Sequence, residues 1–358
     1  MVRMRLSHSV LLALLLAMPI ACSSSPSAAQ FSGEPSATSE AGLEGASVTT
    51  AAACNTGPGV TAVVTDGQYA YSIAVDDGQI YFGSTNGVWR VASTGGTPSI
   101  LSGSSEVDAI AIDTANVYWI GSSLMSAPLG GGDPTIVATG VSANELLADG
   151  LNVYGVDGGA LWAVSVSGGA QRSLIDGPSS GVEAIAVLGD SVYVASFSGI
   201  AAGTSVVYQG SILRVPKAGG AAPVVLVSNQ PHPYAIAVDS TGVYWANAGY
   251  LGVAGGLMHS ALDGGNAAAL PSSANVGSVV LDETNVYWTE DGSRVMKMAK
   301  SGGSPRVVAD ELSGPSALTV NGGNVYWSEQ PELDASVSNI DGGQTGAPPA
   351  ATVMTACE

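Results

Sequence analysis

Histidine is the residue that proteins use most often to transfer protons near neutral pH and to bind zinc, and this chain has only three. His8 lies in the N-terminal segment 1–22, which we interpret as a signal peptide, so His232 and His259 are left in the mature chain. The sequence contains no phosphate-binding loop or calcium-hand spacing. We therefore assign no catalytic residue and favour a protein that binds over one that catalyses.

Carboxylates offer a second kind of chemistry. Glu290 and Asp291 follow one aromatic pair, and Glu329 and Glu332 follow the next pair along the chain. Carboxylate oxygens are the ligands that calcium prefers. A calcium site is an open alternative at these acids, and no other cofactor is expected.

Ring-bearing side chains form the third group, and we predict that five of them bind a ligand: Phe197, Tyr208, His232, Tyr234 and Tyr250. Three of them lie in segments 196–209 and 247–255, which are longer than the corresponding segments elsewhere. Large rings are unexpected in segments so rich in Gly, Ala and Ser, and exposed aromatics often anchor interfaces. The alternative, that these are tolerated surface loops without a partner, stays open.

The elements that must position these residues are repeats. An apolar triplet, an acidic or turn residue, a short turn and an aromatic pair recur seven times, and the tyrosines of the repeats lie 36 to 51 residues apart. In the second copy, residues 110–113 (IAID) lead to 117–119 (VYW). Each copy then continues with a third apolar stretch, a diglycine and a fourth apolar run.

Four short strands in a unit of about 40 residues are typical of a β-propeller blade. We predict an all-β fold, a seven-bladed β-propeller of four-stranded antiparallel blades, with the tyrosine and tryptophan rings in its core. Two-residue hairpin turns with positive φ at both positions are expected at the diglycines. These are residues 95–96, 130–131, 168–169, 219–220, 264–265, 302–303 and 342–343.

Blade geometry then predicts where the five ring-bearing residues meet. Segments 196–209 and 247–255 connect the second and third strands of blades four and five. In a four-stranded blade this connection shares a face with the link to the next blade, and His232 and Tyr234 lie on the link between these two blades. The five residues are therefore expected to converge on one rim.

The repeat resembles a known family. Residues 236–239 (IAVD), followed by Tyr244 and Trp245, resemble the YWTD propeller repeats of the low-density-lipoprotein-receptor class B type, and more loosely the NHL propellers. The resemblance covers about residues 60–345, and residues 287–290 (YWTE) are the nearest copy. It implies a propeller with an extracellular binding role, although those receptor propellers have six blades. It also implies that the first-strand aspartates hydrogen-bond within and between blades: Asp76, Asp113, Asp149, Asp239 and Asp282.

Cysteine positions predict a covalent closure. Once Cys22 is assigned to the signal, Cys54 and Cys357 remain, and they bracket the whole array of repeats. In an oxidising compartment such a pair is expected to form a disulfide, and in a ring-shaped fold the two chain ends must meet. We therefore predict a Cys54–Cys357 disulfide that closes the propeller.

The first 53 residues are interpreted as a signal and a tether. Residues 1–22 have a basic start, a short apolar run and a final Pro19-Ile20-Ala21-Cys22 that resembles a bacterial lipobox, in which Cys22 is lipidated. Ordinary signal cleavage is the alternative, because Pro19 stands where that pattern usually has leucine. Residues 23–53 are predicted to be a disordered Ser/Ala/Gly linker, and residues 54–358 a single propeller domain.

Charge limits the partners. The formal net charge is -19, and loss of Arg3 and Arg5 with the signal makes it -21. Such a surface repels phosphate backbones, so we expect no nucleic acid partner, and we expect membrane attachment only through the N-terminal lipid. The predicted protein is a monomeric binding or scaffolding lipoprotein of the cell envelope, in the outer membrane or facing the periplasm, or secreted if the lipobox is not used. Its partner is a protein or a carbohydrate; the alternative function is a propeller enzyme, a lyase or a metal-dependent hydrolase of the lactonase type.

Overall fold

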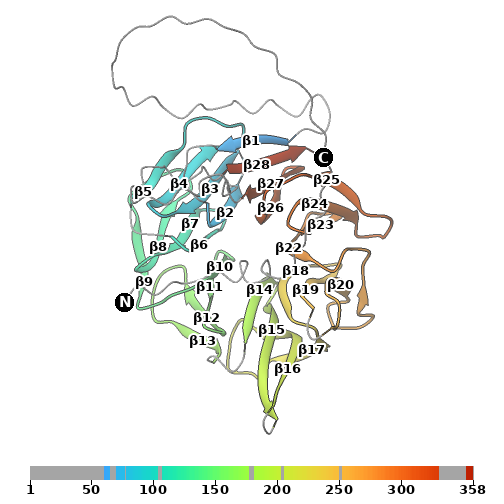
Figure 1. Cartoon of the computed structure of the whole chain (residues 1–358). Helices are drawn as coiled ribbons and strands as arrows, with labels where there is room; N and C mark the ends of the chain where they lie inside the picture. The colour runs from blue at the N-terminus through green and yellow to red at the C-terminus, as the bar shows by residue number, and fades with distance from the viewer. Residues whose placement is uncertain are drawn as a thin grey trace, which may run out of the picture. The chain divides into compact units, whose positions relative to one another are not determined.

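The computed structural model describes residues 60–64, 70–76, 78–103, 107–176, 181–202, 205–249, 252–329 and 352–357. All regular structure within these ranges is β-strand, in seven antiparallel four-stranded sheets that follow one another around a central axis (Figure 1). The prediction of an all-β, seven-bladed propeller is confirmed. The proposed signal and linker, residues 1–53, lie outside the described residues, so these domain boundaries stay predictions.

Each blade is one sheet, and its strands run in order from the innermost to the outermost. Blade one holds β2 (Ser72–Asp76), β3 (Gln79–Ser84), β4 (Gly87–Ala92) and β5 (Ser99–Gly103). Blade two holds β6 (Ala109–Ile112), β7 (Asn116–Ile120), β8 (Ser123–Pro128) and β9 (Thr135–Thr139). Blade three holds β10 (Glu145–Ala148), β11 (Asn152–Asp157), β12 (Ala160–Ser165) and β13 (Arg172–Ile175).

The next blades follow the same plan. Blade four holds β14 (Val182–Leu188), β15 (Ser191–Ala202), β16 (Ser205–Pro216) and β17 (Val224–Gln230). Blade five holds β18 (Pro233–Asp239), β19 (Gly242–Asn247), β20 (Gly256–Ser260) and β21 (Ala268–Ala269). Blade six holds β22 (Val276–Leu281), β23 (Asn285–Glu290), β24 (Arg294–Ala299) and β25 (Arg306–Ala309). Blade seven holds β26 (Ser316–Asn321), β27 (Asn324–Glu329), β28 (Thr352–Cys357) and β1 (Val60–Val64).

The position of β1 in the sheet of blade seven shows how the ring closes. β1 pairs with β28, with Val60 opposite Ala356 and Val64 opposite Val353, so a strand from before the first repeat completes the last blade. The first strand of blade seven, β26, also lies against β2 of blade one. Sequence analysis did not identify this strand and expected a disulfide at the closure. The backbone of Cys357 lies in β28, but its side chain and all of Cys54 lie outside the described residues, so the bond stays a prediction.

The aromatic pairs fill the space between blades. Successive side chains of a strand point to opposite faces, so the two rings of a pair enter two different interfaces. Tyr81 of blade one shares a hydrophobic cluster with Trp119 of blade two, and Tyr244 of blade five shares one with Trp288 of blade six. Burial of such a ring contributes roughly 1.5–3 kcal/mol. The prediction that these rings are core is confirmed.

Blade three uses a different route to the same packing. Its second strand has Gly155 where blades two, five, six and seven have tryptophan, and Trp162 on the third strand lies directly opposite Gly155. A Cβ atom on Gly155 would lie 2.1 Å from Cζ2 of Trp162. The indole therefore occupies the space beside the glycine, and it joins Tyr118 in the cluster between blades two and three.

The first-strand aspartates stabilise the turns that follow them. The carboxylate of Asp113 accepts backbone N–H bonds from Ala115 and Asn116, each at 2.8 Å, and a bond of 2.7 Å from the hydroxyl of Tyr118. Asp149 and Asp282 accept the equivalent three bonds. For these residues the hydrogen bonding implied by the family resemblance is present within the blade. Bonds between blades are also present, because Lys217 pairs with Asp149 and Lys300 pairs with Asp239.

The diglycine turns differ from the prediction. In blade six, Gly302 and Gly303 have the expected positive φ values of 99° and 124°. The connection is longer than the predicted two-residue turn, because six residues, 300–305, separate β24 from β25. In blade two the positive φ values fall on Gly131 and Gly132, one residue later than expected. Residues 342–343 precede the third strand of blade seven, because β28 is that strand and β1 is the fourth. They lie outside the described residues.

The strand connections of the propeller lie on two opposite faces. The loop face carries the connections between second and third strands and the links between blades. The turn face, on the opposite side, carries the connections from first to second and from third to fourth strands. This alternation follows from the antiparallel order of strands in every blade.

Candidate functional site at the border of blades four and five

The insertion in blade four is a strand extension. Residues 196–209 were expected to form a loop, but β15 and β16 continue their pairing from Ser191 opposite Pro216 to Ala202 opposite Ser205. Each of these strands has 12 residues, whereas the equivalent strands of blade one have six. The segment is therefore a paired hairpin that projects from the blade, and it is drawn as the long pair β15–β16 in Figure 1.

Phe197 stands where this hairpin leaves the blade. Its ring stacks on the imidazole of His232, with 4.0 Å between ring centroids and 19° between ring planes. Its backbone N–H donates to the carbonyl oxygen of Gly181 at 2.8 Å. A Cβ atom on Gly181 would lie 2.1 Å from the carbonyl oxygen of Phe197, so glycine is needed for this close approach. The structure thus brings together Phe197 and His232, two of the five predicted residues.

His232 is held in an unusual backbone conformation. Its φ of 63° lies in the left-handed region, which few residues other than glycine adopt. Its N–H donates to the carbonyl oxygen of Gln230 at 3.0 Å, and its own carbonyl oxygen accepts from Ala248 at 2.9 Å. Conformations of this kind cost free energy and gather at functional sites. Here the conformation orients the imidazole toward Phe197.

A polar network supports the link from the blade five side. The side-chain oxygen of Gln230 accepts from the indole N–H of Trp245 and from the amide of Asn247, each at 3.0 Å. Asn247 is buried, and among the described residues nothing donates to its Oδ1. A Cβ atom on Gly210 would lie 2.2 Å from the carbonyl oxygen of Gln230, so the hairpin base fits closely against the link.

Sequence reasoning missed these supporting residues. Gln230, Asn247, Gly181 and Gly210 belong to no recognisable motif, because their roles depend on contacts between blades. One signal was present: Asn247 is the second residue after Trp245, and in blades six and seven the same position holds an acid. In those blades the acid, Glu290 or Glu329, accepts the indole N–H bond from its own tryptophan.

The other three predicted residues are placed differently. Tyr234 packs against the hydrophobic cluster between blades five and six, and burial raises the pKa of its hydroxyl to about 12. Its ring centroid lies 6.2 Å from that of His232. The backbone of Tyr208 pairs with Gly199 in the hairpin, but its side chain lies outside the described residues, as does all of Tyr250. The predicted convergence is therefore seen for Phe197 and His232, while Tyr234 is directed into the interior.

The acids considered for calcium have protein partners. Glu290 is buried and accepts from the backbone N–H of Ser273 at 2.8 Å, and its other oxygen lies 3.4 Å from Arg294. Burial alone would raise the pKa of Asp291, but hydrogen bonds from Ser273 and Arg294 outweigh it and lower that pKa. Glu332 lies outside the described residues. Within the described ranges no three His, Cys, Asp or Glu side chains are grouped closely enough to hold a metal ion.

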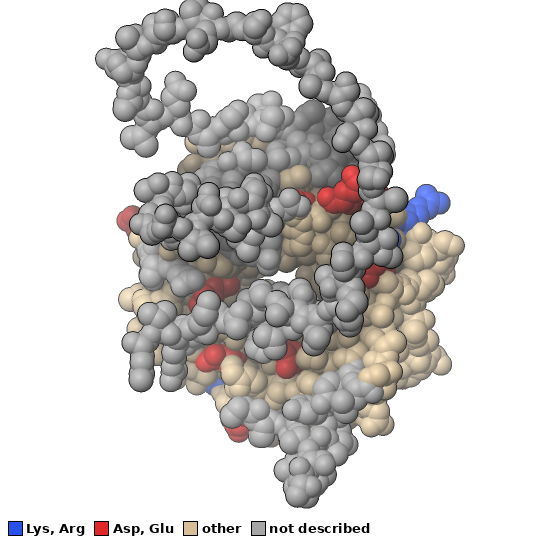
Figure 2. Space-filling view, viewed as in Figure 1, with Lys and Arg blue, Asp and Glu red and all other residues tan. Residues whose placement is uncertain are grey.

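Charge is distributed unequally between the two faces. In the described residues, the half of each blade next to the loop face carries a single base, Arg294. The acids on that half are Asp108, Glu145, Asp157, Asp176, Glu183, Glu290, Asp291, Asp310, Glu311 and Glu329. The turn-face half carries both signs of charge. Its bases are Arg90, Arg172, Arg214, Lys217, Lys297, Lys300 and Arg306, and its acids are Asp76, Asp113, Asp133, Asp149, Asp190, Asp239, Asp263, Asp282 and Glu283. In Figure 2 several acidic side chains flank the central opening.

Comparison with known proteins identifies the fold only. No protein-family model matches the sequence, and no curated protein matches it. The chain is similar to the computationally designed protein Ika8, with a TM-score of 0.53 and 11% identity over 82% of this chain and 98% of that one. It is also similar to BamB from Moraxella catarrhalis, with a TM-score of 0.52 and 13% identity over 82% of this chain and 99% of that one. In the described part of the chain there is no helix that could cross a membrane.

Proposed function

We propose that this protein is an envelope lipoprotein that binds a protein partner on the loop face of its propeller, at the border of blades four and five. The observation that carries the proposal is the stacked pair Phe197–His232 at the base of the projecting hairpin. The pair joins two blades and is held by backbone hydrogen bonds on both sides. A site that is already ordered loses less entropy when a partner binds.

Charge supports a cationic or neutral partner. The loop-face half of the described structure has many acids and one base, which favours basic segments and repels polyanions. The long β15–β16 hairpin adds contact area beside the rings. A protein segment with basic and aromatic residues therefore fits this surface.

Shortening the hairpin tests the site. Joining Ser198 to Gln209 by a two-residue turn removes the projecting part but keeps Phe197 and the paired strands of the blade. We expect a partner captured from an envelope extract to bind at least tenfold more weakly, which corresponds to about 1.4 kcal/mol. The measurement is a binding isotherm with the purified partner, and circular dichroism checks that the strand content is kept.

Point substitutions separate the rings from the hairpin. Phe197→Ala and His232→Gly each remove one ring, and glycine at 232 tolerates the left-handed backbone. Each should weaken binding about tenfold, as expected for an interface anchor. Leu151→Ala is the matched control, since Leu151 is 73% exposed on the turn face of blade three. Equal affinity of all three variants and the unaltered protein would refute this site.

The proposed attachment to the membrane through a lipid on Cys22 is based on the lipobox resemblance, and a separate experiment tests it. Cys22→Ser removes the only thiol that can accept the lipid at that position, so the variant should appear in the soluble fraction instead of the membrane fraction. Partition of the unaltered protein into the aqueous phase of a detergent extraction would show that the signal is an ordinary one. That result would leave the proposed binding site unaffected.

A further inference from the structure

A run of exposed apolar residues lies at the start of the outermost strand of blade four. Residues 221–225 (AAPVV) are all exposed, and Val224 and Val225 have exposed fractions of 45% and 57%. No other run of consecutive exposed apolar residues in the described ranges is as long. Strand β17 is the edge of its sheet, so the run lies on the perimeter of the propeller, next to the turn face (Figure 1). Exposed apolar runs of this kind are typical of interaction surfaces.

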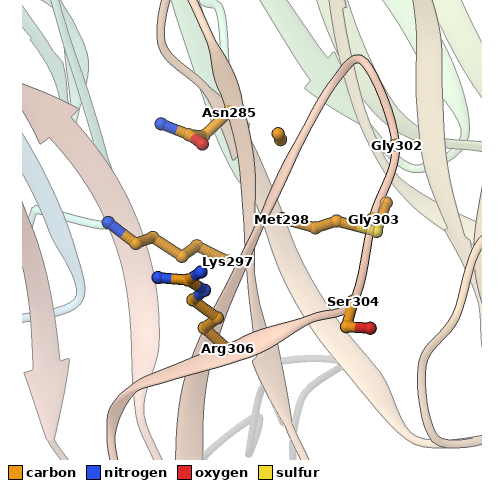
Figure 3. Close-up of a pocket in the computed structure, with 8 residues that line it drawn as sticks. Asn285, Lys297, Met298, Gly302, Gly303, Ser304 and Arg306 are labelled. Carbon is orange, nitrogen blue, oxygen red and sulfur yellow. The ribbon is translucent and has the colours of Figure 1, made fainter.

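Other blades do not repeat this apolar run. The outer residue equivalent to Val224 is polar or charged in four blades and alanine in blade five: Ser99, Thr135, Arg172, Arg306 and Ala268. Figure 3 shows the pair of blade six, Lys297 and Arg306, whose charged side chains leave the sheet on the same side. The aliphatic surface of blade four is therefore a local feature and not a property of the repeat.

A guanidinium lies beside this run. Arg214 is the cross-strand partner of Val224, so both side chains are on the same face of the sheet. In blade one the equivalent Arg90 donates to Oγ of Ser99 at 3.4 Å and to the carbonyl oxygen of Leu129 at 3.3 Å. In blade four the valine offers no acceptor. Arg214 is half-buried, and no described residue forms a hydrogen bond or ion pair with its guanidinium.

The charge around the run differs from that of the rest of the chain. No Asp or Glu occurs between Asp190 and Asp239, and this is the longest stretch without an acid in a chain of net charge -19. The bases of this stretch are Arg214 and Lys217, and Lys217 already pairs with Asp149. At physiological ionic strength, exposed charges more than about 8 Å apart are largely screened. A narrow ligand on this run therefore meets apolar side chains and the charge of Arg214.

We propose that residues 221–225 and Arg214 bind an extended segment of a partner protein, in which aliphatic side chains flank a carboxylate. The aliphatic side chains remove Val224 and Val225 from water. The carboxylate accepts paired N–H bonds from the guanidinium, whose fork matches its two oxygens. This surface lies at the turn-face end of blade four, so it is independent of the site proposed at Phe197 and His232.

Two other occupants fit this surface less well. A second copy of the chain that used the same surface would bring two Arg214 side chains together, and like charges across an interface repel. A membrane is wide, so it would also meet the exposed turn-face acids Asp190 and Asp263, which anionic headgroups repel. A single extended segment avoids both contacts.

Selection from a displayed library of random short peptides tests the proposal on the full chain with Cys22→Ser, which lacks the proposed lipid. We expect enriched peptides in which Asp or Glu stands beside Val, Ile or Leu. Fluorescence anisotropy then measures the affinity of the most enriched acidic–aliphatic peptide. Val225→Asp and Arg214→Gln should each weaken it at least tenfold, and circular dichroism checks that strand content is kept.

Matched controls make the same changes in other blades. Ile136→Asp alters a side chain that is 62% exposed at the equivalent position of blade two, and Arg90→Gln alters the equivalent base of blade one. Both should bind the peptide as the unaltered protein does, and so should Phe197→Ala, which alters the loop-face site. Equal weakening by any of these three variants would overturn the proposal, as would the absence of enriched acidic–aliphatic peptides.

The other occupants have their own measurements. Sedimentation velocity detects a dimer, and co-sedimentation with phosphatidylglycerol vesicles detects membrane binding by the Cys22→Ser chain. We expect a monomer and no binding to vesicles. A dimer that Val225→Asp dissociates would assign the surface to a second copy, and vesicle binding that Val225→Asp abolishes would assign it to a membrane. Either result would overturn the proposal.

Discussion

The ammonium of Lys217 in blade four lies 2.7 Å from the carboxylate of Asp149 in blade three. Both side chains are largely buried, and Asp149 also accepts three hydrogen bonds from its own turn. Lys217 stands two residues before the diglycine of its blade, and Lys300 stands in the same place in blade six, where it reaches Asp239 of blade five. A base on one blade thus holds the turn of the preceding blade.

This pair predicts a loss of stability in acid. Burial alone would raise the pKa of Asp149, but the bonds from Lys217 and the turn outweigh it and lower the pKa to about 2. A carboxyl with a lowered folded-state pKa contributes stability that is present above its unfolded pKa of about 3.9 and is lost as the pH falls toward 2. Asp149→Asn should therefore have a lower melting temperature than the unaltered protein at pH 7. At pH 2 the difference in melting temperature between the two proteins should be smaller. Asp133→Asn, at an exposed carboxylate, is the control and should change neither value.

Glu145 predicts the opposite dependence. It lies on the innermost strand β10, and burial of its carboxyl group raises its pKa to about 8, although the backbone N–H of Ile185 donates to it and opposes this shift. A raised folded-state pKa means that ionisation destabilises the fold, so stability falls as the pH rises from about 4.5 to 8. Glu145→Gln should match the unaltered protein at pH 4 and exceed it in melting temperature at pH 9. An identical difference at both pH values would contradict this assignment.

Gly155 should not tolerate a side chain. A Cβ atom there would overlap the indole of Trp162, so Gly155→Ala should lower the free energy of unfolding by about 1–3 kcal/mol, as overpacking does. Gly130→Ala is the matched control, because a Cβ atom there meets nothing within 4 Å. Chemical denaturation of the two variants measures the difference. Equal midpoints would show that Trp162 can move aside at little cost.

The predicted Cys54–Cys357 disulfide can be tested directly. Mass spectrometry of non-reduced peptides should recover a Cys54–Cys357 link, and free thiols on both residues would refute it. In the chain-entropy description, a loop of this length contributes roughly 5 kcal/mol. Reduction should lower the melting temperature but keep the strand content, because β1 and β28 hold the ring closed through backbone hydrogen bonds.

The sequence by itself determined the blades. The period of the repeats, the apolar triplets and the tyrosine–tryptophan pairs are local sequence patterns. The rings are buried as soon as one blade packs against an adjacent blade with the same repeat. It also located Phe197 and His232 on one rim, because the strand order of a blade fixes which connections share a face.

Only the tertiary structure decided how distant segments meet. The pairing of β1 with β28, the place of Trp162 beside Gly155, and the bonds from Trp245 and Asn247 to Gln230 are contacts between particular side chains or strands that no repeat pattern encodes. The same is true of Lys297 and Arg306, which become neighbours through the register of β24 and β25. Shifting a ladder by one residue would turn one of these side chains to the other face of the sheet, so their contact depends on the register of two strands and not on the sequence of either one.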